Sequence, residues 1–178
     1  NPFFYFFRAE GLTDKRDGKG GSWGVGKTVF PRSSRANTIF GFTVRNDDEE
    51  RLLFGSMTLK THQLNGTCYD PDAWFGIKGA PGVADGMVMP AQDDDLIHAF
   101  TRDFHLARRT EPGLSLVVPW YDPEIDRDAL LAAVLRQWFF PILSDRLVVS
   151  LESPRGGIEI NRHSLIEHLA SCPARVRD

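Results

Sequence analysis

The sequence has little cysteine, no long apolar run and no excess of positive charge, and each absence excludes a class of protein. Cys68 and Cys172 are its two cysteines, too few for a disulfide framework or a cysteine metal cluster. No apolar run approaches the ~20 residues that cross a bilayer. The net charge is −3, so nucleic acid is not indicated as a partner by charge. We expect a cytoplasmic protein without a membrane segment.

What the chain does contain is enough apolar sequence for a globular core, at 42% hydrophobic and 25% charged residues. Its 178 residues favour one domain with a small addition. The sequence opens without Met on the packed aromatics of NPFFYFFRAEG, which has no basic leader and does not resemble a secretory signal. We interpret this start as the interior of a larger protein.

Apolar periodicity predicts strands mixed with helices. Residues 38–64 read as two strands joined by a polar turn at Asn46–Glu50, and 65–86, rich in Gly, Pro and Asp, as a long surface excursion. The other predicted elements are a short helix or strand at 1–9, a short helix within 27–38, a helix from 93 to about 109, a buried strand at 113–120, an amphipathic helix at 126–140, strands at 146–153 and 156–160, and a closing helix capped by Asn161. The fold class is therefore α+β with a largely antiparallel or mixed sheet and helices packed on it.

The stretch GKGGSWGVGKTVF, residues 18–30, fits two glycine patterns. Gly21, Gly26, Lys27 and Thr28 match the phosphate loop G-x-x-x-x-G-K-[ST]. That loop requires a buried strand directly before it and an Asp on a second strand for Mg²⁺. The preceding GLTDKRDGKG is too polar for such a strand, so a P-loop NTPase is the weaker alternative.

The second pattern is G-G-x-x-G-x-G after a polar run at 11–21. It resembles the ATP lid of the GHKL superfamily, which includes the gyrase B subunit, MutL mismatch-repair proteins, large heat-shock chaperone ATPases and sensor histidine kinases, and whose bacterial members carry similar Gly-Ser-aromatic-Gly lids. The resemblance implies a partial two-layer GHKL-like ATP-binding domain over residues 1–120 with its lid at 11–26, followed by a small α/β extension at 121–178. ATP, and Mg²⁺ held through upstream residues, are the implied cofactors.

Glycine amides can approach a triphosphate closely, and the dipole of a following helix would offset its charge. Lys27 is the best candidate for a phosphate contact, and Thr28 either donates to phosphate or caps the helix. Ser115 lies in a Gly-Leu-Ser sequence at 113–115 where the superfamily has Gly-Thr beside the adenine pocket. The predicted nucleotide-binding residues are Gly20, Gly21, Ser22, Gly24, Val25, Gly26, Lys27, Thr28 and Ser115.

Other charged residues have weaker interpretations. Arg32 and Arg35 would face phosphate, a partner or a carboxylate in a surface salt bridge, the last being the more frequent case. His98 and His105, seven apart on a predicted helix, have no third ligand, so no metal site is predicted.

The superfamily also has a catalytic helix with Glu and Asn and an adenine-binding Asp-x-Gly-x-Gly turn, both before the lid. Nothing before residue 18 matches either. The resemblance therefore implies an ATPase part whose hydrolysis depends on upstream residues. The alternative is a binding or scaffold module with a degenerate nucleotide site. Many superfamily members dimerise when ATP closes the lid, so a homodimer is a further expectation.

Overall fold

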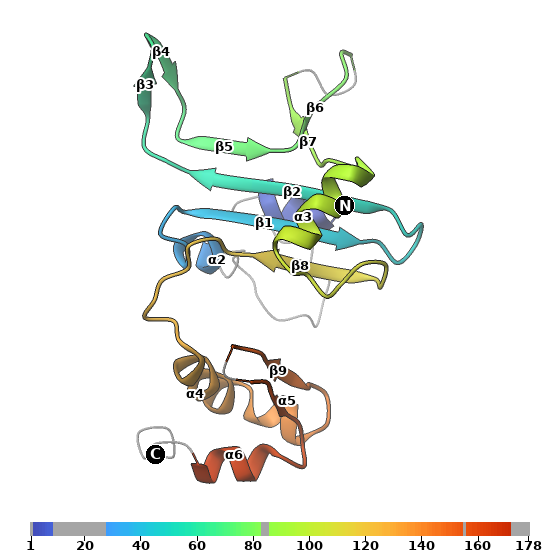
Figure 1. The fold of residues 1–178 in the computed structure, drawn as a ribbon, viewed down its shortest axis with the longest axis vertical. Coiled ribbons are helices and arrows are strands. Elements are labelled where there is room, and N and C mark those ends of the chain that lie inside the picture. The colour runs from blue at the N-terminus through green and yellow to red at the C-terminus, as the bar shows by residue number, and fades with distance from the viewer. Residues whose placement is uncertain (1, 9–27, 83–85, 155, 172–178) are drawn as a thin grey trace. The chain divides into compact units, whose positions relative to one another are not determined.

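The computed structural model describes residues 2–8, 28–82, 86–154 and 156–171. The chain divides into two compact units, Asn1–Asp122 and Pro123–Asp178, referred to below as unit 1 and unit 2. Figure 1 labels most of the elements. They are α1 (Pro2–Arg8), α2 (Val29–Arg32), β1 (Thr38–Val44), β2 (Arg51–Thr58), β3 (His62–Leu64), β4 (Thr67–Tyr69), β5 (Asp72–Phe75), β6 (Ile77–Lys78), β7 (Val88–Met89), α3 (Asp94–Asp103), β8 (Gly113–Val117), α4 (Arg127–Gln137), α5 (Phe139–Leu143), β9 (Val149–Leu151), β10 (Ile158–Ile160) and α6 (Leu165–Ser171).

Unit 1 is built on a four-stranded sheet in the order β5-β2-β1-β8, in which every neighbouring pair is antiparallel (Figure 1). The predicted hairpin of β1 and β2 is confirmed, with Thr38 opposite Met57 at one end and Val44 opposite Arg51 at the other. Aromatic and β-branched residues in β1 favour an extended chain. The polar turn between the strands includes Glu49 at a positive φ of 59°.

Helix α3 covers one face of this sheet. The Asp93 side chain caps it by accepting a hydrogen bond from the Leu96 N–H at 2.8 Å. The helix ends earlier than predicted, at Asp103, because His105 takes a left-handed φ of 51°. Leu106 N–H then bonds to the Thr101 carbonyl, as in a Schellman motif. The buried core between α3 and the sheet consists of Phe42, Val44, Leu53, Ala91, Ile97 and Phe100.

Helix α1 covers part of the opposite face, so unit 1 has a helix on each side of its sheet (Figure 1). This arrangement differs from the two layers that the resemblance implies. Phe7 packs there with Ile39 and Phe54, and Phe3 and Phe6 lie partly buried beside them. Gly41 permits this contact, because a Cβ at that position would lie 2.8 Å from the Phe7 ring. These three phenylalanines of α1 thus contribute to a core on this face of the sheet.

The region 65–86 is more structured than predicted. Its first part forms β4, which pairs with β3 just before the region, and the chain then returns as β5 to the edge of the main sheet. A Cβ on Gly55 of β2 would lie 2.5 Å from the Phe40 ring, so this glycine allows the ring to cross beside β5, where it contacts Phe75 edge-on. The region lies at the surface as predicted, since β5 is mostly exposed, but its pairing with β2 was not predicted.

Unit 2 has a small antiparallel pair, β9 with β10, and three helices. Asp126 caps α4 by accepting from Ala129 N–H at 2.7 Å, and Asn161 accepts from the N–H groups of His163 and Ser164 just before α6. The core of unit 2 consists of Leu135, Ile142, Ile160 and Leu165, all at most 1% exposed.

The protein is α+β with antiparallel sheets, which confirms the predicted fold class. In the part of the chain that the structure describes, no helix has the length and apolar character needed to cross a membrane.

Candidate functional site

Most of the predicted nucleotide-binding residues, Gly20, Gly21, Ser22, Gly24, Val25, Gly26 and Lys27, lie outside the described residues. So do residues 11–20, on which the P-loop alternative depends. Thr28 is described, directly before α2. That helix has only four residues and includes Pro31, which confirms the prediction that it is short. A single turn has little of the helix dipole expected to offset phosphate charge.

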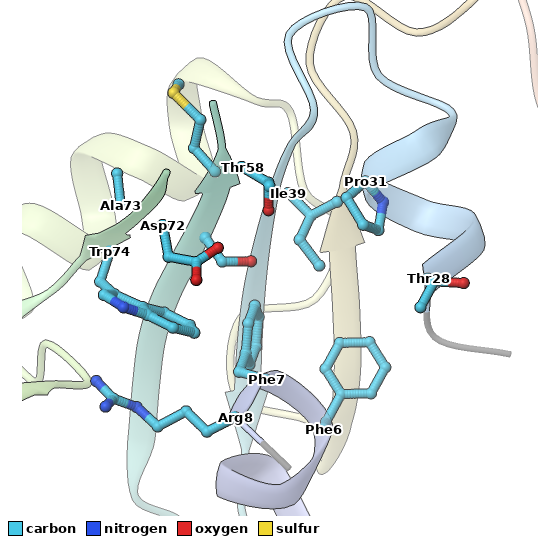
Figure 2. Close-up of a pocket in the computed structure, with 12 residues that line it drawn as sticks. Phe6, Phe7, Arg8, Thr28, Pro31, Ile39, Thr58, Asp72, Ala73 and Trp74 are labelled. Carbon is cyan, nitrogen blue, oxygen red and sulfur yellow. The ribbon is translucent and has the colours of Figure 1, made fainter. Parts of the chain in front are cut away.

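Thr28 borders a cavity of about 440 Å³ on the α1 side of the sheet in unit 1 (Figure 2). The cavity is lined by Phe6, Phe7, Arg8, Thr28, Pro31, Ile39, Ser56, Met57, Thr58, Asp72, Ala73 and Trp74. We call it the aromatic cavity. Arg8 and Thr28 are the described residues on either side of residues 9–27, and both line this cavity.

Three polar side chains share one face of the sheet in this cavity. Ser56 is opposite Trp74 and Thr58 is opposite Asp72 in the pairing of β2 with β5. Directly opposed residues, and residues two apart in a strand, point to the same side. Figure 2 shows the Asp72 carboxylate turned into the space above Phe7. Within the described part of the chain this carboxylate has no ion-pair or hydrogen-bond partner.

Arg8 closes one side of the aromatic cavity. Its guanidinium lies 4.6 Å from the centre of the Trp74 ring and 5.3 Å from that of Phe54, and it donates a hydrogen bond to the Val88 carbonyl. Burial lowers the pKa of the Arg8 guanidinium. Since an arginine titrates far above neutrality, the group stays cationic and the cation–π contacts persist.

A second cavity of about 590 Å³ adjoins the first and shares Thr28, Pro31 and Thr58 with it. Its other lining residues are Arg32, Arg35, Ala36, Asn37, Leu59 and Lys60, and we call it the cationic cavity. The predicted surface salt bridge of Arg32 or Arg35 is not formed among the described residues, whose ion pairs involve other arginines.

Ser115 lies on the other side of the sheet. It is opposite Phe42 in the pairing of β1 with β8, and Phe42 belongs to the core under α3. Thr28 borders the cavities on the α1 side. The structure therefore separates these two predicted binding residues, and a ligand in the aromatic cavity contacts Thr28 without Ser115. The strand β8 is also a half-buried edge strand, not the buried strand predicted.

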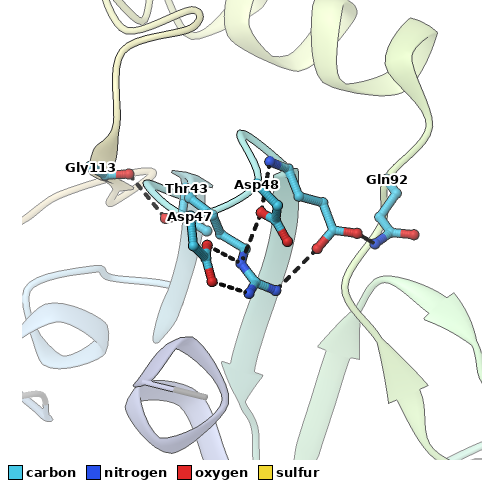
Figure 3. Close-up of polar contacts among 7 residues, drawn as sticks. Thr43, Asp47, Asp48, Gln92 and Gly113 are labelled. Atoms are coloured by element: carbon cyan, nitrogen blue, oxygen red, sulfur yellow. Dashed lines mark hydrogen bonds and ion pairs between the residues drawn. The ribbon is translucent and has the colours of Figure 1, made fainter.

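A separate polar cluster closes the turn between β1 and β2 (Figure 3). Arg45 donates to both carboxylate oxygens of Asp47, at 3.0 and 2.7 Å, and to Glu50 at 3.3 Å. The side-chain hydrogen bond from Arg45 lowers the pKa of Asp47 to about 2. Gln92 donates to the second oxygen of Glu50. The Arg45 guanidinium is shared by Asp47, Asp48 and Glu50 within the turn, so this cluster stabilises the hairpin.

No metal site emerges from the described residues, in which no three His, Cys, Asp or Glu side chains converge. His105 lies beyond the end of α3, so it does not share a helix with His98 as predicted. His98 contacts Arg51 at 3.4 Å. The described cavity residues thus do not form a Mg²⁺ site by themselves.

Sequence reasoning missed Arg8, Asp72, Trp74 and Lys60 as cavity residues. The alternation of Asp72 and Trp74 with Ala73 and Phe75 is a period-two pattern consistent with a strand, which would place Asp72 and Trp74 on one face. The neighbouring Gly and Pro residues obscured it. Comparison with protein-family models, curated proteins and solved structures found no match to this chain.

Proposed function

We propose that unit 1 binds ATP in the aromatic cavity and its neighbour, as the nucleotide-binding part of a GHKL-like ATPase. One observation carries the proposal. The segment with the GGSWGVGK sequence begins after Arg8 and ends at Thr28, and both residues line the same cavity. The described residues on either side of the glycine-rich sequence therefore border one cavity.

The aromatic cavity suits a planar base. Phe6, Phe7 and Trp74 give it an apolar wall, and pockets of a few hundred Å³ with a few polar groups are typical of small-molecule sites. Asp72 is an acceptor without a partner among the described residues. A carboxylate accepts hydrogen bonds only, so it selects a base with an exocyclic amine, as adenine has.

The triphosphate would extend past Thr28. Lys27 directly precedes that residue in the sequence, and its ammonium is a point charge suited to phosphate. The glycine amides of residues 20–26 would add donors without Cβ clashes. Ser115 takes no part, because it faces the α3 side.

The proposal concerns binding. The chain has no candidate for the Glu that activates water, and the resemblance places this residue, and the Mg²⁺ ligand, upstream. A non-catalytic module that uses ATP binding only to change conformation or to dimerise is the alternative. Hydrolysis assays on the longest polypeptide containing this chain separate the two, since only an ATPase releases phosphate.

Isothermal titration with ATP and a non-hydrolysable analogue tests the proposal. We expect binding that Gly24→Ala with Gly26→Ala weakens at least about tenfold, the effect of losing about one charge-assisted hydrogen bond. Asp72→Asn is expected to reduce the preference for ATP over inosine triphosphate. Gly157→Ala is the control, because a Cβ there meets its neighbours at ordinary distances of 3.7 Å or more. Absence of binding, or equal affinity in the double variant, would refute the proposal.

A further inference from the structure

The cationic cavity has an unbalanced charge. Three of its lining residues, Arg32, Arg35 and Lys60, carry positive charge, and no Asp or Glu lines it. The chain as a whole has a net charge of −3, so carboxylates are not scarce. The concentration of one sign in one cavity is therefore a local feature of the fold.

None of the three cations is neutralised within the described part of the chain. By contrast, Arg45, Arg51 and Arg102 each have a carboxylate 2.5–3.3 Å away. Arg32, Arg35 and Lys60 are exposed and have no side-chain partner. Like charges around one space repel each other, and a bound anion removes that repulsion.

The backbone that presents the arginines is fixed. Arg35 N–H donates to the Trp120 carbonyl at 2.9 Å, and the Ser34 hydroxyl donates to the Pro119 carbonyl at 2.7 Å. Ser34 itself is 3% exposed. Lys60 follows β2, whose Thr58 N–H donates to the Asn37 carbonyl at 3.1 Å. These bonds hold the two sides of the cavity together, which reduces the ordering needed when a ligand binds.

The lining groups match phosphate chemistry. Arginine presents a planar set of donors to phosphate oxygens and lysine presents a point charge. The Asn37 amide and the hydroxyls of Thr28 and Thr58 provide neutral donors around the same space. Three separate cations are better suited to several linked phosphates than to a single phosphate group.

We propose that Arg32, Arg35 and Lys60 bind a polyphosphate chain in the cationic cavity. The inference rests on the proposed function in one respect, namely that the polyphosphate is the tail of ATP, whose base lies in the adjoining aromatic cavity. Thr28, which lines both, then lies where base and tail meet. The phosphates would then be held by Arg32 at the end of α2, Arg35 shortly after it and Lys60 just after β2.

The test compares inorganic tripolyphosphate, ATP and adenosine by isothermal titration. The variant Arg32→Gln, Arg35→Gln, Lys60→Gln is expected to bind tripolyphosphate and ATP at least about tenfold more weakly, and adenosine unchanged. The charge-matched control is Lys78→Gln, Arg146→Gln, Arg162→Gln, three exposed cations outside both cavities. It should leave all three affinities within about twofold, since distant surface charges are screened by salt.

The outcomes separate this inference from the proposed function. Tripolyphosphate binding that is lost only in the cavity variant supports the cationic site. If ATP binds no more tightly than tripolyphosphate, the cationic site stands and the nucleotide proposal fails. ATP binding unaffected by the cavity variant overturns the cationic site and leaves the nucleotide proposal standing. Equal losses in the two triple variants overturn it as well, because net charge alone would then explain them. Circular dichroism and thermal unfolding of both variants establish that the fold is intact.

Discussion

The two faces of the main sheet in unit 1 differ in how completely they are covered. Under α3, Phe42 and Leu53 are fully buried, and Ile97 is 1% exposed. On the α1 side two adjoining cavities remain open along the strands β1, β2 and β5. The same strands supply both faces, because successive residues point to opposite sides.

The sheet has a closed core under α3, whereas on the α1 side a smaller core of Phe7, Ile39 and Phe54 leaves room for a ligand. Close-packed apolar side chains under α3 remove the most area from water. The α1 side instead keeps polar groups such as Asp72 and Thr58 near solvent, which adds little to stability. Substitutions under α3 are therefore expected to change the free energy of unfolding alone, and those that line the cavities to change ligand affinity as well.

The largest effect is expected from Leu53→Ala, on the closed face. Leu53 is fully buried against α3, so the substitution loses transfer free energy and leaves a cavity, together about 3 kcal/mol. Urea unfolding followed by circular dichroism measures this. The same change at Leu114, 43% exposed on the edge strand β8, is the control and should cost less than about 1 kcal/mol. Altered ATP affinity in folded Leu53→Ala would contradict the division of roles.

An intermediate effect on stability is expected from Trp74→Ala, on the open face. The indole stacks on Phe54 at 5.5 Å and lies beside Arg8, but it is only partly buried. We expect a loss of about 2 kcal/mol, below that of a fully buried aromatic. Unlike Leu53→Ala, it should also weaken adenosine binding, measured by titration. Trp74→Phe, which keeps an aromatic wall, should restore most of that affinity.

The smallest effect is expected from Arg45→Gln, at the turn between the strands and away from both cavities. Arg45 lowers the pKa of Asp47 to about 2 from its usual 3.8, so their contact stabilises the fold above pH ~4 and is lost as the pH falls through about 2. Without Arg45, a carbon-13 NMR titration should find the pKa of Asp47 raised toward its usual value, because the side-chain hydrogen bond from Arg45 is the largest cause of the shift. The control Arg102→Gln, which removes the pair with Asp103, should leave the pKa of Asp47 unchanged. ATP affinity should be unchanged in both variants.

The sequence predicted the fold best where the signal was local. The hairpin of β1 and β2 follows from alternating apolar residues around a polar turn, and α3 from a capping Asp93 before a helical pattern. The end of α3 at Asp103 was not predicted, because no pattern in the sequence indicates the left-handed backbone conformation of His105. Strand β5 was missed because its stability comes from pairing with β2, fourteen or more residues earlier.

The candidate site was predicted only in part. Thr28 and the glycines before it form a motif that is visible in one stretch of chain. The cavities bring together Arg8, Thr28, Ser56 and Asp72, which are far apart in the sequence. The sequence also did not predict the separation of Ser115 from Thr28, because this separation depends on the register between β1 and β8.

The sequence by itself determined the α+β class, the order of most helices and strands, and the glycine-rich segment, since periodicity, caps and motifs act over a few neighbouring residues. Only the tertiary structure decided which side of the sheet each polar group faces, and that Arg32, Arg35 and Lys60 surround one space without a carboxylate. The physical reason is that burial and electrostatic surroundings are set by neighbours in space, which come from distant parts of the chain.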